Sequence, residues 1–379
     1  MPQLSFLNAP HFDFGAIASI NEVLRTLGVR RPLICTDPGL VQIALVDKLR
    51  EQLSNEYGWE LYAETPENPT EEAIEAALEQ YQQGNCDSLI CFGGGSSIDL
   101  GKVVSLLAEQ GGKPSDYSVQ AGGEIRKTVP FVAIPTTAGT GSEVSNGAVV
   151  IMRDGNKLIL ASPALVPDAA ICDPELTLGL PPVLTAGAGM DAVTHCIEAI
   201  LAPSINPPAE AVGLDGLERA IGSKSLLNAV KDGSDREARW QMMMAATEGA
   251  MAFTKGLGVV HAMSHACGSI KALKLHHGTL NGVILPTVLR FNKGAVTEGK
   301  YERIARAMGL AENTDLADHI ESLNRDIGLP ANLSEMGVTQ DRFDYLIQHS
   351  QRDVCHMIAP KQPSYDEYQK LFAQAAGLA

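Results

Sequence analysis

The pattern of apolar residues along the chain changes near residue 180. Before that point, short buried-strand patterns alternate with helical ones. The clearest strand patterns are Arg31–Thr36, Ser88–Phe92 and Val129–Ile134. Strands that alternate with helices are typical of a parallel sheet with right-handed crossovers. After residues 180–182 the pattern is helical to the C-terminus. The sequence therefore predicts an α/β domain over residues 1–180 and an all-helical domain over residues 181–379.

Individual elements are predicted within both halves. In the first half we expect helices over Ile17–Leu27 and Leu40–Leu53, a strand over Trp59–Ala63, and a helix that Thr70 caps. Asp99 and Lys102 stand three residues apart in the segment GGGSSIDLGK and are expected to pair on a helix surface. In the second half we expect helices over residues 184–201, 209–221, 225–230, 235–254, 259–272, 279–292, 296–309, 314–326, 339–349 and 365–376.

Charge and cysteine usage exclude several classes of function. The formal net charge of −16 disfavours binding to nucleic acid or to anionic membranes, which both require a basic surface. The seven cysteines are odd in number, irregularly spaced and without a C-x-x-C pair, which favours a reducing compartment. The N-terminus does not resemble a signal peptide, and no apolar run approaches the roughly 18 residues that span a bilayer. We expect a cytoplasmic homo-oligomer, a dimer or larger, that acts on small molecules.

Histidines are concentrated in the second half of the chain. Four of the nine fall in the segment GLGVVHAMSHACGSIKALKLHHG, residues 256–278. His261 and His265 stand four residues apart, so a helix carries both on one face. The doublet His276–His277 closes the segment. Because one of the doublet can join His261, this region is a candidate for metal binding.

A second constellation lies upstream, in the segment GMDAVTHCIEA. It places Asp191 and His195 four residues apart, again on one helix face. Two such helices can converge on one divalent cation, with His261 and one member of the doublet His276–His277 completing the set. Spacing does not choose between the two doublet residues.

The candidate ligand set consists of one carboxylate and three neutral imidazoles. Such a set suits Fe(II), Zn(II) or Mn(II), and the softness of the donors does not distinguish them. The site would carry about one net positive charge, which favours Lewis-acid catalysis at an alcohol or carbonyl oxygen. His265, one helical turn beyond His261, is placed to relay a proton between that oxygen and water.

The first half carries signals for a nucleotide. The glycine-rich turn Gly93–Ser97 joins a strand to a helix, where free backbone N–H groups favour a pyrophosphate. Thr136 and Thr137 follow the next strand, at the sheet edge where open α/β folds bind ligands. Asp37 ends an early strand, where an acid can accept from ribose hydroxyls or simply cap a helix.

These motifs together resemble a known family. Five segments occur in the order seen in the iron-containing (group III) alcohol dehydrogenases: GGGSSIDLGK, PTTAGTGSE, GMDAVTHCIEA, GVVHAMSHACG and HHGTLNGVILP. The resemblance covers nearly the whole chain. It implies a Rossmann-like N-terminal domain followed by an all-α metal-binding domain, the architecture shared with dehydroquinate synthase, with NAD(P) between the two.

The resemblance also implies roles for individual residues. The implied metal ligands, for Fe(II) in this family, are Asp191, His195, His261 and His277, since the family's ligand directly precedes the glycine. An acid at the position of Asp37 accompanies NAD rather than NADP. The other positions that match contacts with the cofactor are Asn68, Gly94, Gly95, Ser96, Ser97, Thr136, Thr137 and Lys157.

The resemblance and one lysine suggest a substrate. The KGLG and LHHGTLN segments are most similar to the 4-hydroxybutyrate dehydrogenase branch, and Lys255 precedes the metal helix, where its ammonium is expected to pair with a substrate carboxylate. The leading hypothesis is an NAD-dependent interconversion of a primary alcohol and an aldehyde, such as 4-hydroxybutyrate and succinic semialdehyde. The alternatives are a dehydrogenase for neutral short-chain alcohols, diols or glycerol, a dehydroquinate synthase-like lyase, and a binding protein without turnover.

Overall fold

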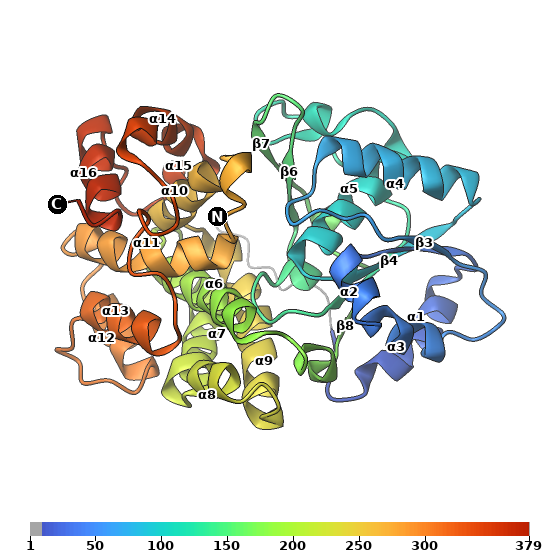
Figure 1. The fold of residues 1–379 in the computed structure, drawn as a ribbon, viewed down its shortest axis with the longest axis horizontal. Coiled ribbons are helices and arrows are strands. Elements are labelled where there is room, and N and C mark those ends of the chain that lie inside the picture. The colour runs from blue at the N-terminus through green and yellow to red at the C-terminus, as the bar shows by residue number, and fades with distance from the viewer. Residues whose placement is uncertain (1–9, 379) are drawn as a thin grey trace. The chain divides into compact units, whose positions relative to one another are not determined.

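The computed structural model describes residues 10–378 and divides into two compact units. The α/β unit comprises residues 10–137 and 141–177, and the helical unit comprises residues 138–140 and 178–378. A parallel sheet with helices forms the first unit, and helices alone build most of the second (Figure 1). The fold class predicted from the sequence is therefore confirmed.

Six parallel strands form the main sheet, in the order β1-β8-β5-β4-β2-β3. They are β1 (His11–Phe12), β2 (Pro32–Cys35), β3 (Glu60–Tyr62), β4 (Ser88–Gly93), β5 (Phe131–Pro135) and β8 (Ala169–Cys172). Every residue of β2, β4 and β5 is buried, as expected where helices cover both faces of a sheet. Cys35 lies opposite Cys91 in the register, and Gly93 lies opposite Pro135, so the carboxyl ends of these strands share one edge.

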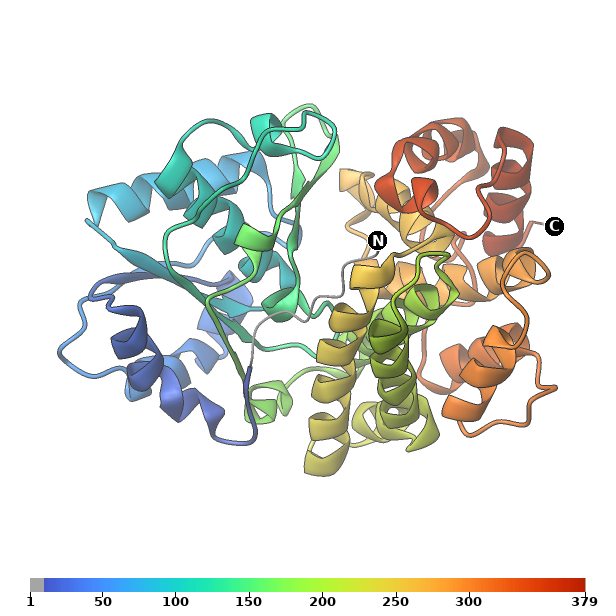
Figure 2. The same cartoon turned by 180° about the vertical axis from the view of Figure 1, so that it is seen from behind.

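Helices cover both faces of this sheet (Figures 1 and 2). The helices α4 (Glu71–Gln83) and α5 (Gly95–Gln110) pack on one face, and α1 (Ile20–Leu27) and α3 (Leu45–Gln52) pack on the other. Successive strand side chains point to opposite faces, so Leu33 joins the first layer and Ile34 the second. As predicted, Thr70 caps α4, because its hydroxyl accepts a hydrogen bond from the Ala73 N–H at 3.2 Å.

Two local features differ from the sequence prediction. The helix expected over Leu40–Leu53 is divided into α2 (Pro38–Gln42) and α3, because Ala44 between them has a left-handed φ of 55°. An antiparallel hairpin of β6 (Gly147–Ile151) and β7 (Lys157–Ala161) was not predicted. Its Asp-Gly turn, at residues 154–155, is a hairpin signal that the sequence offered.

Asp99 and Lys102 do not form the predicted surface pair. Lys102 is fully buried, and its ammonium donates to the carbonyl oxygens of Ser145 and Gly147, both at 2.8 Å. Burial lowers the pKa of Lys102 to about 8. Asp99 accepts from the Val149 N–H at 2.9 Å. Lys102 therefore holds the chain where it enters β6, and Asp99 holds β6 itself. The two residues support the backbone instead of forming a solvated pair on the helix surface.

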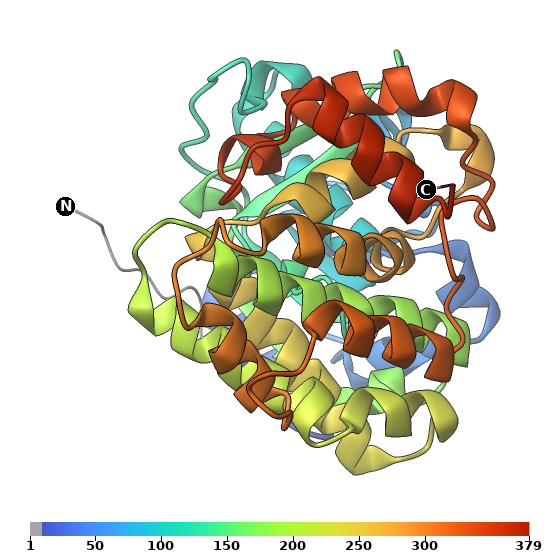
Figure 3. The same ribbon diagram turned by 90° about the vertical axis from the view of Figure 1, so that its left-hand side faces the viewer.

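The long helix α6 (Pro182–Leu201) is the centre of the helical unit and is buried over nearly its full length. It packs against α7, α8, α9 and α11, and Figures 2 and 3 show these helices around it. Residues 138–140 join this unit because Gly139 lies against α6, where an added Cβ would come within 2.7 Å of the Ala188 carbonyl oxygen. The other helices are α7 (Pro207–Leu217), α8 (Ser225–Lys231), α9 (Arg236–Ala252), α10 (Val259–Gly268), α11 (His277–Asn292), α12 (Lys300–Ala307), α13 (Leu316–Asp326), α14 (Phe343–Arg352), α15 (Val354–Met357) and α16 (Tyr365–Ala375).

Within residues 10–378, no helix combines the length and the apolar character that a membrane span requires.

Candidate metal centre and cofactor edge

Three helices of the helical unit carry the four side chains expected to bind metal. Helix α6 contributes Asp191 and His195, which are 2% and 5% exposed. The Nε2 atom of His195 lies 3.6 Å from Oδ1 of Asp191, as expected for residues one helical turn apart. Helix α10 contributes His261, and α11 begins at His277.

The donor atoms of these helices meet at Asp191. Its Oδ1 lies 3.9 Å from Nε2 of His261 and 3.6 Å from Nε2 of His277. The donor atoms of these three residues all lie within 4.8 Å of one another. His195 lies beside them, with its ring stacked on that of His261 at 4.8 Å between centroids. The structure therefore brings a carboxylate and the imidazoles together in one place, which is buried except at His277.

The structure also distinguishes the two members of the histidine doublet. His276 is the N-cap of α11, and its Nδ1 accepts from the Thr279 N–H at 3.3 Å. His277, the first helical residue, instead directs Nε2 toward Asp191. Spacing alone left this choice open, and the geometry supports His277.

Further side chains hold this group in place. Glu198, on α6, contacts Nδ1 of His261 at 2.6 Å, and the hydroxyl of Ser264 contacts Nδ1 of His277 at 2.8 Å. The ring nitrogen that points away from Asp191 thus has a polar partner in both residues. Such partners select the tautomer and the orientation of a metal-binding imidazole.

The contacts of Asn281 show whether the side chains around Asp191 suit a cation. Its amide nitrogen donates to Oδ1 of Asp191 at 2.7 Å and lies 3.3 and 3.2 Å from Nε2 of His261 and His277. The carboxylate and both imidazoles thus turn acceptor atoms toward one point. A divalent cation satisfies several converging acceptors better than one amide does, so the donor set fits such an ion.

His195 is neutral at physiological pH. Burial lowers its pKa to about 4, although the negative charge of Asp191 opposes the shift. A neutral imidazole keeps a lone pair for coordination, whereas an imidazolium has none. His195 can therefore act as a ligand throughout the neutral range.

His265 lies next to this group and has a carboxylate partner. Its Nδ1 is 2.9 Å from Oδ2 of Asp353, and its ring stacks on His277 at 5.3 Å between centroids. Burial acts to raise the pKa of Asp353, but His265 and the hydrogen bonds from Cys355 together outweigh it and lower the pKa to about 2. Asp353 is therefore ionised at neutral pH and accepts the hydrogen bond from His265.

The sequence analysis missed four of these partners. Glu198, Ser264 and Asn281 each stand three or four residues beyond an expected ligand, so helical spacing offered a signal for them. Asp353 offered no local signal, because its partner His265 is 88 residues away in the chain.

In the α/β unit, two predicted cofactor segments lie together at the carboxyl edge of the sheet. The Thr136 N–H donates to the Gly93 carbonyl oxygen at 3.0 Å, so the threonines adjoin the glycine-rich turn. Gly93 has a φ of 154°, and an added Cβ would lie 2.6 Å from the Ser97 hydroxyl, so this turn requires glycine. Among the described residues, no side chain caps the start of α5 at Gly94–Gly95. Its N–H groups suit a phosphate.

Three other predicted cofactor residues lie in the same unit. Asp37 follows β2 and is the N-cap of α2, since Oδ1 accepts from the Leu40 N–H at 3.0 Å. Asn68 lies in the loop whose Glu67 carbonyl oxygen accepts from the Ser96 hydroxyl, which ties that loop to the start of α5. Lys157 begins β7, where its charge acts on Asp99.

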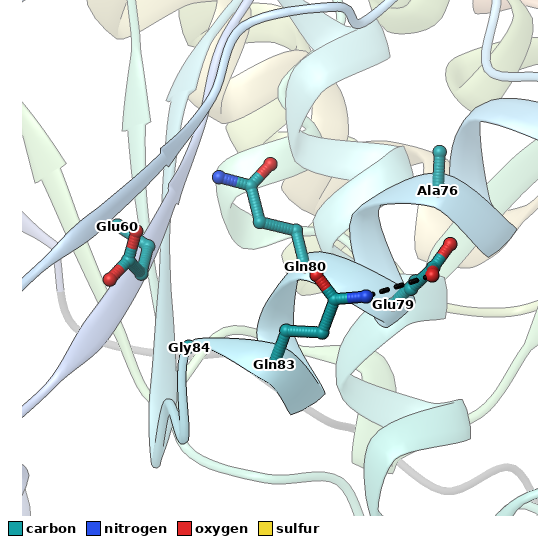
Figure 4. Close-up of a pocket in the computed structure, with 6 residues that line it drawn as sticks. All are labelled: Glu60, Ala76, Glu79, Gln80, Gln83 and Gly84. Carbon is teal, nitrogen blue, oxygen red and sulfur yellow. Dashed lines mark hydrogen bonds between the residues drawn. The ribbon is translucent and has the colours of Figure 1, made fainter.

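A surface hollow elsewhere in the α/β unit contains none of the predicted cofactor residues. It is lined by Glu60 of β3 and by residues at the C-terminal end of α4, as Figure 4 shows. Gln83 donates to Glu79 there at 2.8 Å. None of the expected site residues lines the hollow, and we assign it no role.

Comparison with known proteins agrees with this geometry. Residues 9–174 match the family model for iron-containing alcohol dehydrogenase, and residues 185–376 match the C-terminal model of the same family. The chain is 45% identical to a 4-hydroxybutyrate dehydrogenase of Cupriavidus necator, over 99% of this chain and 100% of that protein. It is 33% identical to an NAD-dependent methanol dehydrogenase of Bacillus methanolicus, over 95% and 96%. A crystal structure of 1,3-propanediol oxidoreductase matches with a TM-score of 0.90 at 32% identity, over 99% and 100%.

The structure corrects the expected role of Lys255. Its side chain is 2% exposed, and its ammonium donates to the carbonyl oxygens of Ala199 and Ile200 at 2.9 and 3.1 Å and also to that of Ala202. These groups end α6, where the helix dipole favours a cation. Glu210 lies 3.7 Å away as a counter-ion. An ammonium held in this way is not available to a substrate carboxylate.

We expect Lys255→Met to lower stability. The substitution leaves the buried Ala199 carbonyl oxygen without its lysine donor, which typically costs about 1–3 kcal/mol. Lys300 also donates to the carbonyl oxygens of Ile200 and Ala202, so these two keep a partner. Urea unfolding of the whole chain measures the change. Lys293→Met is the control, because Lys293 is 69% exposed and its pairing with Asp315 should contribute little. An unfolding midpoint that moves no further for Lys255→Met than for the control would contradict this assignment.

Proposed function

Because this chain belongs to the iron-containing alcohol dehydrogenase family, we propose that it interconverts 4-hydroxybutyrate and succinic semialdehyde with NAD(H) and bound Fe(II). Family membership makes it a metal-dependent oxidoreductase of alcohols and aldehydes. The convergence of Asp191, His261 and His277, with His195 beside them, carries the proposal.

The proposed ligands are these four residues. One carboxylate and three neutral imidazoles suit Fe(II), and the same donors accept Zn(II) or Mn(II). A divalent ion bound there supplies Lewis-acid catalysis at an alcohol or aldehyde oxygen. The protein contributes the orientation: Asn281 holds the Asp191 carboxylate, and Ser264 holds the His277 ring.

His265 is assigned to proton transfer. It lies against His277, and ionised Asp353 accepts from its Nδ1, which leaves Nε2 as the basic nitrogen of the neutral ring. A histidine held in this way can carry a proton between the reacting oxygen and water. These contacts around the ring support a relay rather than a fifth ligand.

The carboxyl edge of the α/β sheet is assigned to NAD. The turn Gly94, Gly95, Ser96 and Ser97 is assigned to the pyrophosphate, because the start of α5 offers backbone N–H groups. Asp37 follows β2, where its charge favours a free ribose hydroxyl over a 2′-phosphate. The remaining assigned contacts are Asn68, Thr136, Thr137 and Lys157.

The substrate assignment depends on sequence similarity. The chain is more similar to 4-hydroxybutyrate dehydrogenase, at 45% identity, than to the methanol dehydrogenase or the propanediol oxidoreductase. We assign no residue to bind the carboxylate of the substrate, because the ammonium of Lys255 is already bound to carbonyl oxygens of α6 and to Glu210. The similarity to 1,3-propanediol oxidoreductase favours one alternative, a dehydrogenase for neutral short-chain alcohols, diols or glycerol. A dehydroquinate synthase-like lyase is a weaker alternative, and it predicts no NADH consumption with any aldehyde.

We also propose that the enzyme works as a cytoplasmic homo-oligomer. All seven cysteines, which lie within the described residues, are free thiols, as expected in a reducing compartment. Light scattering of the purified chain tests the assembly, and a monomer at micromolar concentration would exclude it.

The central test measures NADH consumption with succinic semialdehyde, butanal and 3-hydroxypropanal. Chelation of the metal should abolish turnover, and Fe(II) should restore it. The kcat/KM should be highest for succinic semialdehyde. Higher values for butanal or 3-hydroxypropanal would favour the neutral-substrate alternative, and full turnover without metal would exclude the proposed site.

The histidine doublet provides matched variants for the same test. His277→Ala removes a proposed ligand and should abolish both metal binding and turnover. His276→Ala removes only the cap of α11 and should retain the metal. Elemental analysis of both variants decides, and the reverse pattern would show that His276 is the ligand.

Asp37 variants test the choice of cofactor. The unaltered enzyme should prefer NADH, and Asp37→Gly should improve the use of NADPH because repulsion of the 2′-phosphate is lost. Asp37→Asn removes the charge but keeps a side chain that caps α2, so it should have the same effect without a loss of stability. Equal kcat/KM for both cofactors in the unaltered enzyme would refute the assignment.

His265→Ala tests the proton relay. The variant should retain its metal and lose alcohol oxidation by about 10²–10⁴-fold, the usual range for general acid–base catalysis. Metal content and kcat are measured on the same preparation. If the metal is lost together with activity, His265 supports the ligands and the relay is wrong.

A further inference from the structure

We propose that Glu198 positions His261 for metal binding, by holding the tautomer in which Nε2 carries the lone pair. The inference rests on the metal site proposed above. It adds to that site a residue that is not itself one of the proposed ligands. Glu198 lies on α6, three residues after His195, and is 3% exposed. It contacts His261 across the gap between α6 and α10.

Three contacts define the position of the carboxylate. Oε2 lies 2.6 Å from Nδ1 of His261, Oε1 accepts from the Val260 N–H at 2.8 Å, and Oε2 also receives the His261 N–H at 3.4 Å. Both oxygens therefore act as acceptors for backbone N–H groups. An oxygen in this role accepts a hydrogen bond from the ring, so Nδ1 of His261 carries the N–H that is donated.

The tautomer follows from this bond. A neutral imidazole carries one N–H, so a donating Nδ1 leaves Nε2 with its lone pair. Nε2 is the atom that lies 3.9 Å from Asp191 among the other donor atoms. The opposite tautomer would place a hydrogen at Nε2 and block coordination.

The chain leaves room for this contact at Gly258. An added Cβ there would lie 2.7 Å from Oε1 of Glu198, too close for a carboxylate in its present position. Gly258 is the residue before α10, so the first turn of this helix can reach Glu198 only without a side chain at that position. This arrangement also caps α10, and the experiment must separate capping from positioning.

Glu198→Gln separates them. Glutamine keeps the shape but has one acceptor atom, so its NH₂ group faces either Nδ1 of His261 or the backbone N–H groups. We expect the affinity for Co(II), titrated into the metal-free full-length chain by calorimetry, to fall about 10–100-fold, as for other partners of metal-binding histidines. The thermal midpoint of the metal-free protein is measured in parallel. A residue that only caps α10 would lower that midpoint and leave the Co(II) affinity unchanged.

Glu248→Gln is the matched control. Glu248 is a partly buried carboxyl of the helical unit, and burial together with Asp215 raises its pKa to about 9, although Arg219 at 3.2 Å opposes the shift. Its partners are Arg219 and Asp215 rather than the proposed ligands, so the Co(II) affinity should stay at the value of the unaltered chain.

A second variant changes the residue that packs against the Glu198 carboxylate. Gly258→Ala should displace Glu198 without removing its charge, and it should also weaken Co(II) binding. The role of Glu198 is overturned if Glu198→Gln binds Co(II) as tightly as the unaltered chain. If Glu198→Gln does not fold, the same result for Gly258→Ala overturns it. If the unaltered chain binds no Co(II), the metal site itself fails and the positioning role fails with it.

Discussion

Asp191 and His277 meet because helices α6 and α11 approach each other backbone to backbone. An added Cβ at Gly278 would lie 2.1 Å from the carbonyl oxygen of Gly187, and one at Gly187 would lie 2.6 Å from Nδ1 of His276. Neither position can accept a side chain without moving the helices apart. Close packing of this kind transmits such a displacement directly to neighbouring groups. The spacing of the donor atoms therefore depends on two glycines that supply no donor atom themselves.

The burial of these donors explains why their environment is so strongly constrained. A carboxylate removed from water costs free energy unless hydrogen bonds or a cation compensate it. Asp191 has the amide of Asn281 and the surrounding imidazoles, and burial keeps His195 neutral. The far nitrogens of the rings are held by Glu198 and Ser264. The helical unit thus presents several acceptors to one place and restricts their rotation beforehand.

The α/β unit uses buried charge for a different purpose. The Lys102 ammonium holds the backbone between β5 and β6 through carbonyl oxygens, and Asp99 holds β6 through the Val149 N–H. The segment from Ser145 to Val149 is therefore anchored to helix α5, which carries both charged residues. Lys255 does the same for the end of α6. In both cases a lysine close to a functional motif stabilises the backbone, which a sequence motif alone does not reveal.

Periodicity and motif spacing determined the fold class, most of the helices, three of the residues that turn toward one another and the doublet that contains the fourth. These signals are local: a residue four positions away lies on the same helix face whatever surrounds the helix. The tertiary structure decided what depends on distant segments. It separated His276 from His277 through the start of α11, paired His265 with Asp353, and buried Lys255 against α6. Such contacts join residues from different helices, and packing rather than sequence spacing sets the distances between them.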